Sequence, residues 1–306
     1  MGNWLTYGAG LIGMLLLIGA ALLYTPDLPR PALEAAYAGP PSQFVTAAGV
    51  RLHVRDTGPR DAPAIVLLHG FGSSLHTWDG WAADLERDYR VVRFDLPGFG
   101  LTGADPSGDY TDARSLVVIT GLLDALGVDR VTIGGNSMGG RIAWRFAAAY
   151  PARVERLVLI SPDGFASPGQ AYGAAPSVPL LLRALPYVLP SGMLRQTLAP
   201  AYADAARLNG AVFDRYRDMM LAPGVRRAIV DRTAQHVVTD PVPELARIVS
   251  PVLVLWGEQD RLIPIANAAD YKRVLPHATL QTLPGLGHVP QEEAPETVAI
   301  VRAFLR

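Results

Sequence analysis

The hydrophobic positions of the chain fall into short, fully apolar runs, separated by longer stretches in which apolar residues recur at helical spacing. Runs such as Ala64 to Leu68 and Val252 to Trp256 predict strands that are buried on both faces. Stretches such as Thr111 to Leu126, which ends at Gly127, predict the intervening helices. This alternation predicts an α/β domain with a mostly parallel sheet. The predicted strands are 44–46, 50–56, 64–68, 89–94, a run that begins at Val131, 154–160, 252–256 and 279–283.

The alternation of strand and helix stops between Ile160 and Val252. The roughly 90 residues in between are rich in Pro, Ala, Leu and Arg, and they are too many for an ordinary loop. They predict a helical cap at about 164–248, inserted over the edge of the sheet where the parallel strands end. Most of its apolar side chains are expected to form the core of the cap, and a minority to line an apolar substrate pocket. The helical patterns lie near 180–189, 193–205, 212–221 and 225–237.

The first 25 residues contain a long apolar segment, Trp4 to Tyr24, that carries no charged residue. A helix of this length, at about 1.5 Å per residue, spans about 30 Å, which matches the hydrocarbon core of a bilayer. The segment therefore predicts one transmembrane anchor within residues 1–25. A cleaved signal peptide is the alternative, with Ala36 to Ala38 as a small-x-small cleavage site. The length of the segment and the absence of Lys or Arg before it favour the uncleaved anchor.

Residues 26–42 follow the apolar segment and are rich in proline. This composition predicts a stiff linker between the membrane and the domain at 43–306. We expect a single-pass protein of a bacterial inner membrane. The side of the membrane stays open, because Arg30 is the only nearby charge on which the positive-inside rule can act.

Composition and charge remove several classes of function. The net charge is −1 and no run of Lys or Arg occurs, so a nucleic-acid partner is not expected. The chain has no cysteine, which excludes disulfides, thiolate metal sites and a cysteine nucleophile. The six histidines show no metal-ligand spacing, and no dinucleotide-binding fingerprint is present, so we expect neither a metal nor another cofactor.

The strongest chemical motif lies at Gly135, Ser137 and Gly139, where an apolar strand pattern changes to a helical one. The Gly-x-Ser-x-Gly spacing is typical of a nucleophile elbow, a tight turn that raises the serine hydroxyl at a helix N-terminus. Upstream, His69 to Gly72 directly follow a buried strand. In an elbow enzyme such a loop supplies one oxyanion-hole N–H and the residue after the serine supplies the other, which predicts the N–H groups of Phe71 and Met138.

An acid and a base follow the serine in the expected order. Asp260 comes just after the strand at 252–256, and His288 lies in a glycine-flanked loop after the last strand. The order Ser, Asp, His is the order of this triad in elbow hydrolases. Asp163 is a rival acid because it also follows a strand. Asp95 is expected to cap its own Pro-Gly turn instead of taking part in catalysis.

Taken together, these motifs resemble the α/β-hydrolase fold superfamily from about residue 43 to the C-terminus. The resemblance implies an eight-stranded, mostly parallel sheet flanked by helices, with a helical cap inserted. It also implies that Ser137 is the nucleophile, Asp260 the triad acid and His288 the general base, with Phe71 and Met138 as oxyanion donors. The segments that carry it are His69 to Gly72, Asp95 to Gly100, Gly135 to Gly140, Trp256 to Asp260 and Gly287 to His288.

Within this superfamily the sequence favours a serine carboxylesterase or lipase that cleaves a small-molecule or lipid ester with an apolar acyl group. The serine argues against the dehalogenases and epoxide hydrolases of the same fold, which use Asp at this position. The alternative is a carbon-carbon bond hydrolase of aromatic-ring degradation, which Asn136 to Gly140 resemble. A non-catalytic scaffold is disfavoured because no triad residue is missing. The candidate substrate contacts are Asn136, Phe165, Arg215 and Val289.

Two of these positions bear on the choice between the two hydrolases. Arg215 matches the substrate arginine of the carbon-carbon hydrolases, which favours that alternative. Those enzymes usually carry Trp after the catalytic histidine, where this chain has Val289, and they tend towards glycine at the position of Phe71. Both departures favour the ester hydrolase.

Overall fold

The computed structural model describes residues 7, 14, 19, 21, 23–166 and 169–306. Its centre is one eight-stranded sheet with the order β1-β2-β4-β3-β5-β6-β7-β8. The pairs β1–β2 and β2–β4 are antiparallel and the remaining pairs are parallel, which confirms the mostly parallel sheet. The strands are Ser42–Ala47 (β1), Val50–Thr57 (β2), Ala64–Leu68 (β3), Arg90–Phe94 (β4), Val131–Asn136 (β5), Val154–Ile160 (β6), Val252–Gly257 (β7) and Thr279–Leu283 (β8).

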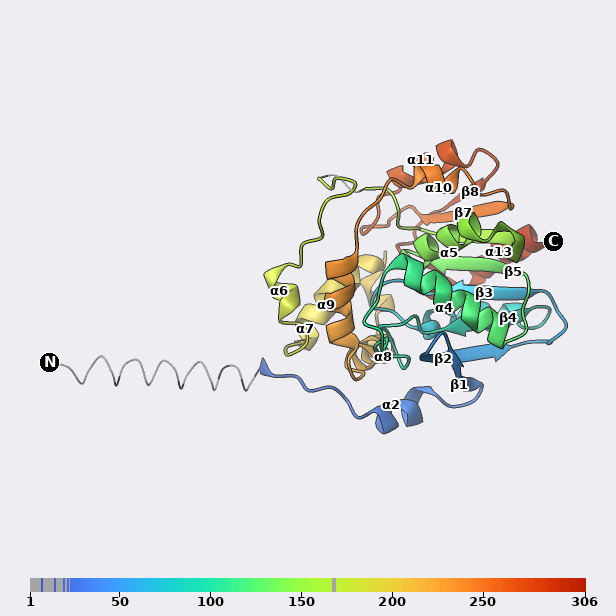
Figure 1. The fold of residues 1–306 in the computed structure, drawn as a ribbon. Helices are drawn as coiled ribbons and strands as arrows, with labels where there is room; N and C mark the ends of the chain where they lie inside the picture. Colours follow the sequence, from blue (N-terminus) through green and yellow to red (C-terminus); the bar gives the residue numbers. More distant parts are fainter. Residues whose placement is uncertain (1–6, 8–13, 15–18, 20, 22, 167–168) are drawn as a thin grey trace.

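Helices cover both faces of the sheet and gather at one of its ends (Figure 1). The flanking helices are Asp79–Leu85 (α3), Asp112–Ala125 (α4), Met138–Ala149 (α5), Ala266–Val274 (α11), Pro290–Glu293 (α12) and Val298–Leu305 (α13). Between β6 and β7 lie Leu180–Arg183 (α6), Ser191–Leu198 (α7), Gly210–Met220 (α8), Val225–Gln235 (α9) and Val242–Leu245 (α10). Short 3-10 turns lie at Leu75–Trp78, Pro151–Arg153, Ala199–Ala201, Ala205–Arg207 and Pro295–Thr297.

The two faces of the sheet carry separate hydrophobic cores, because successive side chains of a strand point to opposite faces. In β3, Val66 and Leu68 share one core with apolar residues of α4 and α5. Ile65 and Leu67 share the other core with residues of α3 and α13. The unbroken apolar run in the sequence therefore corresponds to a strand that is covered on both sides.

The cap helices α6 to α9 gather at one end of the sheet, beside the N-terminal segment of the described chain (Figure 1). Buried apolar side chains join this cap to the larger core of the domain. The cap was expected to use most of its apolar residues in this way. Leu180 and Leu181 of α6 are exceptions, since 81% and 69% of their surface is exposed.

Residues 26–42 differ from the stiff, extended linker that their prolines predicted. They contain helix α2 (Arg30–Tyr37), which has a proline in its first turn and buries Leu33. Pro31 can occupy this turn because the first N–H groups of a helix have no partner within the helix. The Tyr37 hydroxyl donates to the Asp218 carboxylate at 2.8 Å. The prolines therefore start a helix that packs on the domain.

The C-terminal part of the chain is divided into two helices. It consists of α12, a 3-10 turn and then α13. Pro295 lies at the break, because a proline inside a helix removes one hydrogen bond and clashes with the preceding turn.

The predicted membrane anchor falls almost entirely outside the described residues, and it stays a prediction. Within the part of the chain that the structure describes, no helix is both long enough and apolar enough to cross a membrane. The first continuous described stretch begins at Leu23.

Candidate active site

Ser137 lies in a strained turn between β5 and α5. Its φ is 56° and its ψ is −122°, a conformation that costs a non-glycine residue about 1–3 kcal/mol. The neighbouring glycines permit the turn. A Cβ on Gly135 would lie 2.3 Å from the Gly139 carbonyl oxygen, and one on Gly139 would lie 2.3 Å from the Leu68 oxygen. The elbow therefore needs glycine at both positions, as the motif predicted.

Replacing Gly135 with Ala should destabilise the fold strongly, because the new methyl group meets backbone atoms that cannot move aside. We expect a loss of about 3 kcal/mol in the free energy of unfolding, measured by urea denaturation. Gly192→Ala in α7 is the matched control, since a Cβ there meets nothing within 4 Å. Equal stability of the two variants would show that the elbow is not under this steric constraint.

The loop after β3 lies against the serine. A Cβ on Gly70 would lie 3.2 Å from the Ser137 Cβ atom, a tight contact that shows how closely the loop approaches the nucleophile. His69 fixes the loop, since its Nδ1 is 2.8 Å from the Gly70 oxygen and its Nε2 accepts from the Leu96 N–H at 2.9 Å. Burial lowers the pKa of His69, which keeps the ring neutral in this bridging role. Phe71 follows Gly70 and lines the cavity in front of Ser137.

His288 and Asp260 form a buried pair. The His288 Nδ1 atom lies 2.7 Å from the Asp260 Oδ2 atom. The other carboxylate oxygen of Asp260 accepts from the N–H groups of Leu262 and Ile263, at 2.8 and 2.9 Å. Both oxygens of this carboxylate are thus hydrogen-bonded, which fixes its orientation and, through it, that of the imidazole ring.

Two other carboxylates that the sequence singled out do not hold His288. The Asp163 carboxylate lies 3.3 Å from Arg141, and its side chain is 38% exposed. Asp95 is completely buried and accepts from the N–H groups of Leu75 and Leu101, at 2.7 and 2.8 Å. The turn-capping role expected of Asp95 is confirmed.

A cavity of about 250 Å³ brings the candidate residues together. Ser137, His288 and the loop from Gly70 to Ser73 line it from the sheet side, and residues of α7 and α8 line it from the cap. Val289, a predicted substrate contact, also lines this cavity. The nucleophile, the base and the oxyanion loop, which lie far apart in the sequence, therefore face one space.

A second cavity of about 360 Å³ adjoins the first. The two share Phe71, Leu194, Thr197 and Met220 as lining residues. Apart from one threonine, the residues that line the second cavity are all apolar and most belong to the cap. They are Phe71, Pro179, Leu181, Leu182, Leu185, Leu189, Met193, Leu194, Thr197, Met220 and Ile229.

Of the predicted substrate contacts Asn136 and Phe165, only the first lines the cavity in front of Ser137. Asn136 lines the cavity, but its amide donates to the carbonyl oxygens of His288 and Ile160, at 2.9 and 3.1 Å. It therefore anchors the histidine loop to the sheet. Phe165 packs edge-on against Tyr271, with ring centroids 5.0 Å apart, and is not among the residues that line either cavity.

Arg215 is held in an ion pair with Glu292. Its Nη2 lies 3.2 Å from the Glu292 carboxylate, which also accepts from the hydroxyls of Tyr202 and Tyr216, at 2.7 and 2.9 Å. Glu292 belongs to α12, which begins shortly after His288, whereas the other three residues belong to the cap. This cluster joins the cap to the histidine loop. No local sequence pattern predicts this cluster beyond the adjacent acids of α12, because its members are up to 90 residues apart.

No group of three or more His, Asp or Glu side chains is placed to hold a metal ion within the described ranges.

A family model described as alpha/beta hydrolase fold matches residues 63–295, and the chain belongs to this family. The family and the similar proteins support the assignment of the chain as a hydrolase.

Three comparisons illustrate the range of activities among similar proteins. The chain is 31% identical over 263 residues to a 2-hydroxy-6-oxononadienedioate/2-hydroxy-6-oxononatrienedioate hydrolase of Pseudomonas putida, covering 81% of this chain and 88% of that one. The solved structure of a bacterial membrane phospholipase A is 28% identical, with a TM-score of 0.74, and covers 100% of this chain and 98% of that one. A thermophilic esterase from Thermogutta terrifontis is 26% identical, with a TM-score of 0.70 and coverage of 87% and 98%.

Proposed function

We propose that the protein is a serine hydrolase of carboxylic esters that carry an apolar acyl chain. The observation that carries this proposal is the apolar cavity of about 360 Å³ that adjoins the cavity of Ser137 and His288. A hydrocarbon chain placed there removes its surface from water at about 0.8 kcal/mol per methylene, and it leaves the ester carbonyl beside the serine. Similarity to a membrane phospholipase A and to an esterase supports the proposal.

In the first half of the reaction, the Ser137 hydroxyl attacks the ester carbonyl while His288 Nε2 takes the hydroxyl proton. The Phe71 and Met138 N–H groups bind the oxyanion of the tetrahedral intermediate. When the intermediate collapses, the bond to the alcohol oxygen breaks and His288 returns the proton to the leaving alkoxide. Asp260 holds the ring in the tautomer that has its proton on Nδ1. The products of this half are the alcohol and an acyl-Ser137.

In the second half, water attacks the acyl-Ser137 carbonyl and His288 takes one proton of that water. Collapse of the second tetrahedral intermediate breaks the bond to the Ser137 oxygen, which regains its proton from His288. The carboxylic acid leaves and the enzyme returns to its starting state. No cofactor is consumed in this cycle.

Blocking the apolar cavity should shorten the acyl chains that the enzyme accepts. For Leu182→Trp we expect kcat/KM for p-nitrophenyl palmitate to fall by at least about 10-fold, because the indole fills the space of the distal methylenes, while p-nitrophenyl butyrate stays within about 2-fold. Leu180→Trp is the matched control, since its side chain is exposed and does not line the cavity. Equal losses on both esters would place the acyl chain elsewhere.

Carbon-carbon bond hydrolysis is the second candidate, and the similarity to the Pseudomonas putida hydrolase favours it. In this chain the cap arginine is paired with Glu292, so binding a substrate carboxylate would require this ion pair to open. If the protein is a carbon-carbon bond hydrolase, Arg215→Gln should abolish turnover of 2-hydroxy-6-oxo-6-phenylhexa-2,4-dienoate. If the protein is an ester hydrolase, wild type and Arg215→Gln should both hydrolyse p-nitrophenyl esters, with kcat/KM values within about 10-fold of each other.

We also propose that the chain is attached to a bacterial inner membrane through the apolar segment Trp4 to Tyr24. The residues that follow this segment are bound to the cap. The Thr25 N–H donates to the Tyr187 oxygen at 2.8 Å, and Arg226 contacts the Asp27 carboxylate at 2.7 Å. Such contacts would keep the cap next to the anchor. The full chain should sediment with membranes and resist alkaline extraction, and a chain that starts at Thr25 should not.

A further inference from the structure

A third cavity, of about 210 Å³, lies beside the nucleophile helix and is lined by three arginines. Arg141 and Arg145 come from α5, and Arg232 comes from α9. Asp112 of α4 is the one carboxylate in its lining. None of the residues that line this cavity also lines the cavity in front of Ser137. We call it the arginine cavity.

Asp112 is shared between two of the arginines. Its carboxylate lies 3.3 Å from Arg141 Nη2 and 3.1 Å from Arg145 Nη1. Asp163 and Glu244 approach the same two arginines from outside the cavity, at 3.3 and 3.4 Å. Both outer side chains are partly exposed, so water screens their charge. The lining itself therefore contains three arginines and one carboxylate, and the other two acids lie outside it.

Arg232 has only neutral partners. Its guanidinium donates to the carbonyl oxygens of Tyr110 and Pro97, at 2.9 and 2.8 Å, and only 4% of the residue is exposed. Burial lowers its pKa to about 10. Because this value is still well above neutral pH, the group keeps its charge. His236, which also lines the cavity, is neutral at that pH because burial and the charge of Arg141 lower its pKa. It adds no negative charge.

The three arginines also leave hydrogen-bonding capacity unused. The Nε atom of each is buried and has no hydrogen-bond partner within the described part of the chain. An unpaired buried donor costs about 1–3 kcal/mol, and more when it is charged. Because these Nε atoms have almost no accessible surface, a ligand in the cavity would meet the charge of the arginines rather than these N–H groups.

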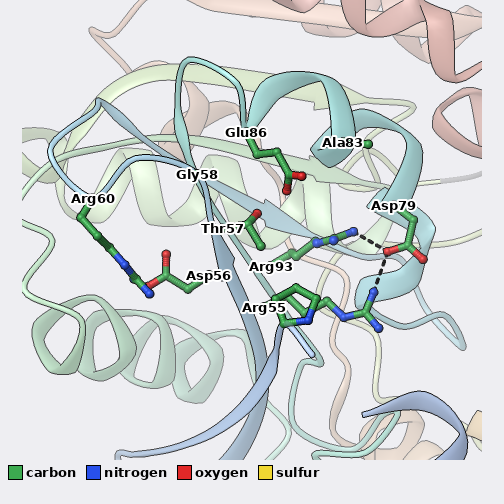
Figure 2. A pocket seen from close by; sticks show the side chains of 10 residues that line it. Arg55, Asp56, Thr57, Gly58, Arg60, Asp79, Ala83, Glu86 and Arg93 are labelled. Atoms are coloured by element: carbon green, nitrogen blue, oxygen red, sulfur yellow. Dashed lines mark hydrogen bonds and ion pairs between the residues drawn. The ribbon is translucent and has the colours of Figure 1, made fainter. Parts of the chain in front are cut away.

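A larger hollow, shown in Figure 2, illustrates the contrast. It has a volume of about 620 Å³ and also contains three arginines, but these are matched by three acidic residues in its lining. Figure 2 shows Arg55 and Arg93 both reaching Asp79, and Arg60 lying beside Asp56. The lining of this hollow contains as many acids as arginines, whereas the lining of the arginine cavity contains three arginines and one carboxylate.

We propose that the arginine cavity binds a phosphate-bearing anion. Planar guanidinium groups recognise phosphate oxygens through paired, charge-assisted hydrogen bonds. The cavity volume of about 210 Å³ is far above the ~15 Å³ that a single water requires, so that a phosphate group and its remaining hydration fit inside. The site is additional to ester hydrolysis and does not depend on it.

Isothermal titration of the full chain with inorganic phosphate, at constant ionic strength maintained with chloride, tests the proposal. We expect saturable binding at one site with a Kd below about 1 mM. Arg145→Gln should weaken it at least about 10-fold, and Arg145→Lys, which keeps the charge but loses the planar fork, should also weaken it. Arg227→Gln is the matched control, because this arginine is an exposed residue of α9 outside the cavity. It should bind phosphate like wild type.

A parallel titration with sn-glycerol 3-phosphate separates the two sources of a phosphate group. Tighter binding than that of inorganic phosphate identifies an organic phosphate as the ligand, and weaker binding identifies the free ion. Absence of saturable phosphate binding to the wild type overturns the proposal. So does equal binding by wild type and both Arg145 variants, which far-UV circular dichroism would show to be folded.

Discussion

Ser137→Ala should lose about 10⁶-fold in kcat towards p-nitrophenyl esters, because the acyl-enzyme can no longer form. The hydroxyl is the only group of the variant that changes, and the strained turn around it depends on Gly135 and Gly139 rather than on the serine side chain. The variant should therefore fold like wild type. The measurement is the initial rate of ester hydrolysis, at an enzyme concentration high enough for the rate to exceed that of the uncatalysed reaction.

Ser73→Ala provides the control for this experiment. Ser73 lines the same cavity, but its hydroxyl bonds to the Tyr216 hydroxyl at 3.4 Å and is not placed in the turn after β5. We expect a loss of less than about 10-fold. If Ser137→Ala retained most of the activity while Ser73→Ala lost it, the nucleophile would be assigned wrongly. A fluorophosphonate should label the wild type and Ser73→Ala, and should leave Ser137→Ala unlabelled.

Asp260→Asn should lose about 10⁴-fold in kcat near neutral pH. Leu262 and Ile263 donate their N–H groups to one carboxylate oxygen, so the amide oxygen of Asn will take that place. The amide NH₂ group then faces His288 Nδ1, which must accept a hydrogen bond in place of donating one. The ring proton moves to Nε2, and the histidine can no longer take the proton of Ser137.

Asp163→Asn is the matched control, because this residue was the rival acid and lies near Arg141. We expect its kcat to stay within about 10-fold of wild type. A larger loss for Asp163→Asn than for Asp260→Asn would reverse the assignment of the triad acid. Both variants should have the circular dichroism spectrum of the wild type.

The fold could be predicted to a large extent because its main signals are local. The apolar run Ala64 to Leu68 coincides with β3, and 154–160 coincides with β6. The Gly-x-Ser-x-Gly spacing encodes the elbow because a Cβ at either glycine meets backbone atoms. The pairing of His288 with Asp260 followed from their order along the chain and from the parallel sheet, which brings the carboxyl ends of its strands to one edge.

The features that the sequence did not show depend on contacts between distant segments. The prolines of residues 26–42 have the composition of a linker, and only the burial of Leu33 against the domain shows that this part folds. Arg215 stays a predicted substrate contact, and its pairing with Glu292, 77 residues further along, could not be predicted. Phe165 also stays a prediction, and its packing against Tyr271 could not be predicted. No local pattern of residues reports such partners.

The most direct test of the central claim is a comparison of two substrate classes on the wild-type full chain. We would measure kcat/KM for p-nitrophenyl esters from butyrate to palmitate and for 2-hydroxy-6-oxo-6-phenylhexa-2,4-dienoate under the same conditions. We expect kcat/KM for the best ester to exceed that for the dienoate by at least about 10³-fold. Faster turnover of the dienoate than of every ester would contradict it and would identify the protein as a carbon-carbon bond hydrolase.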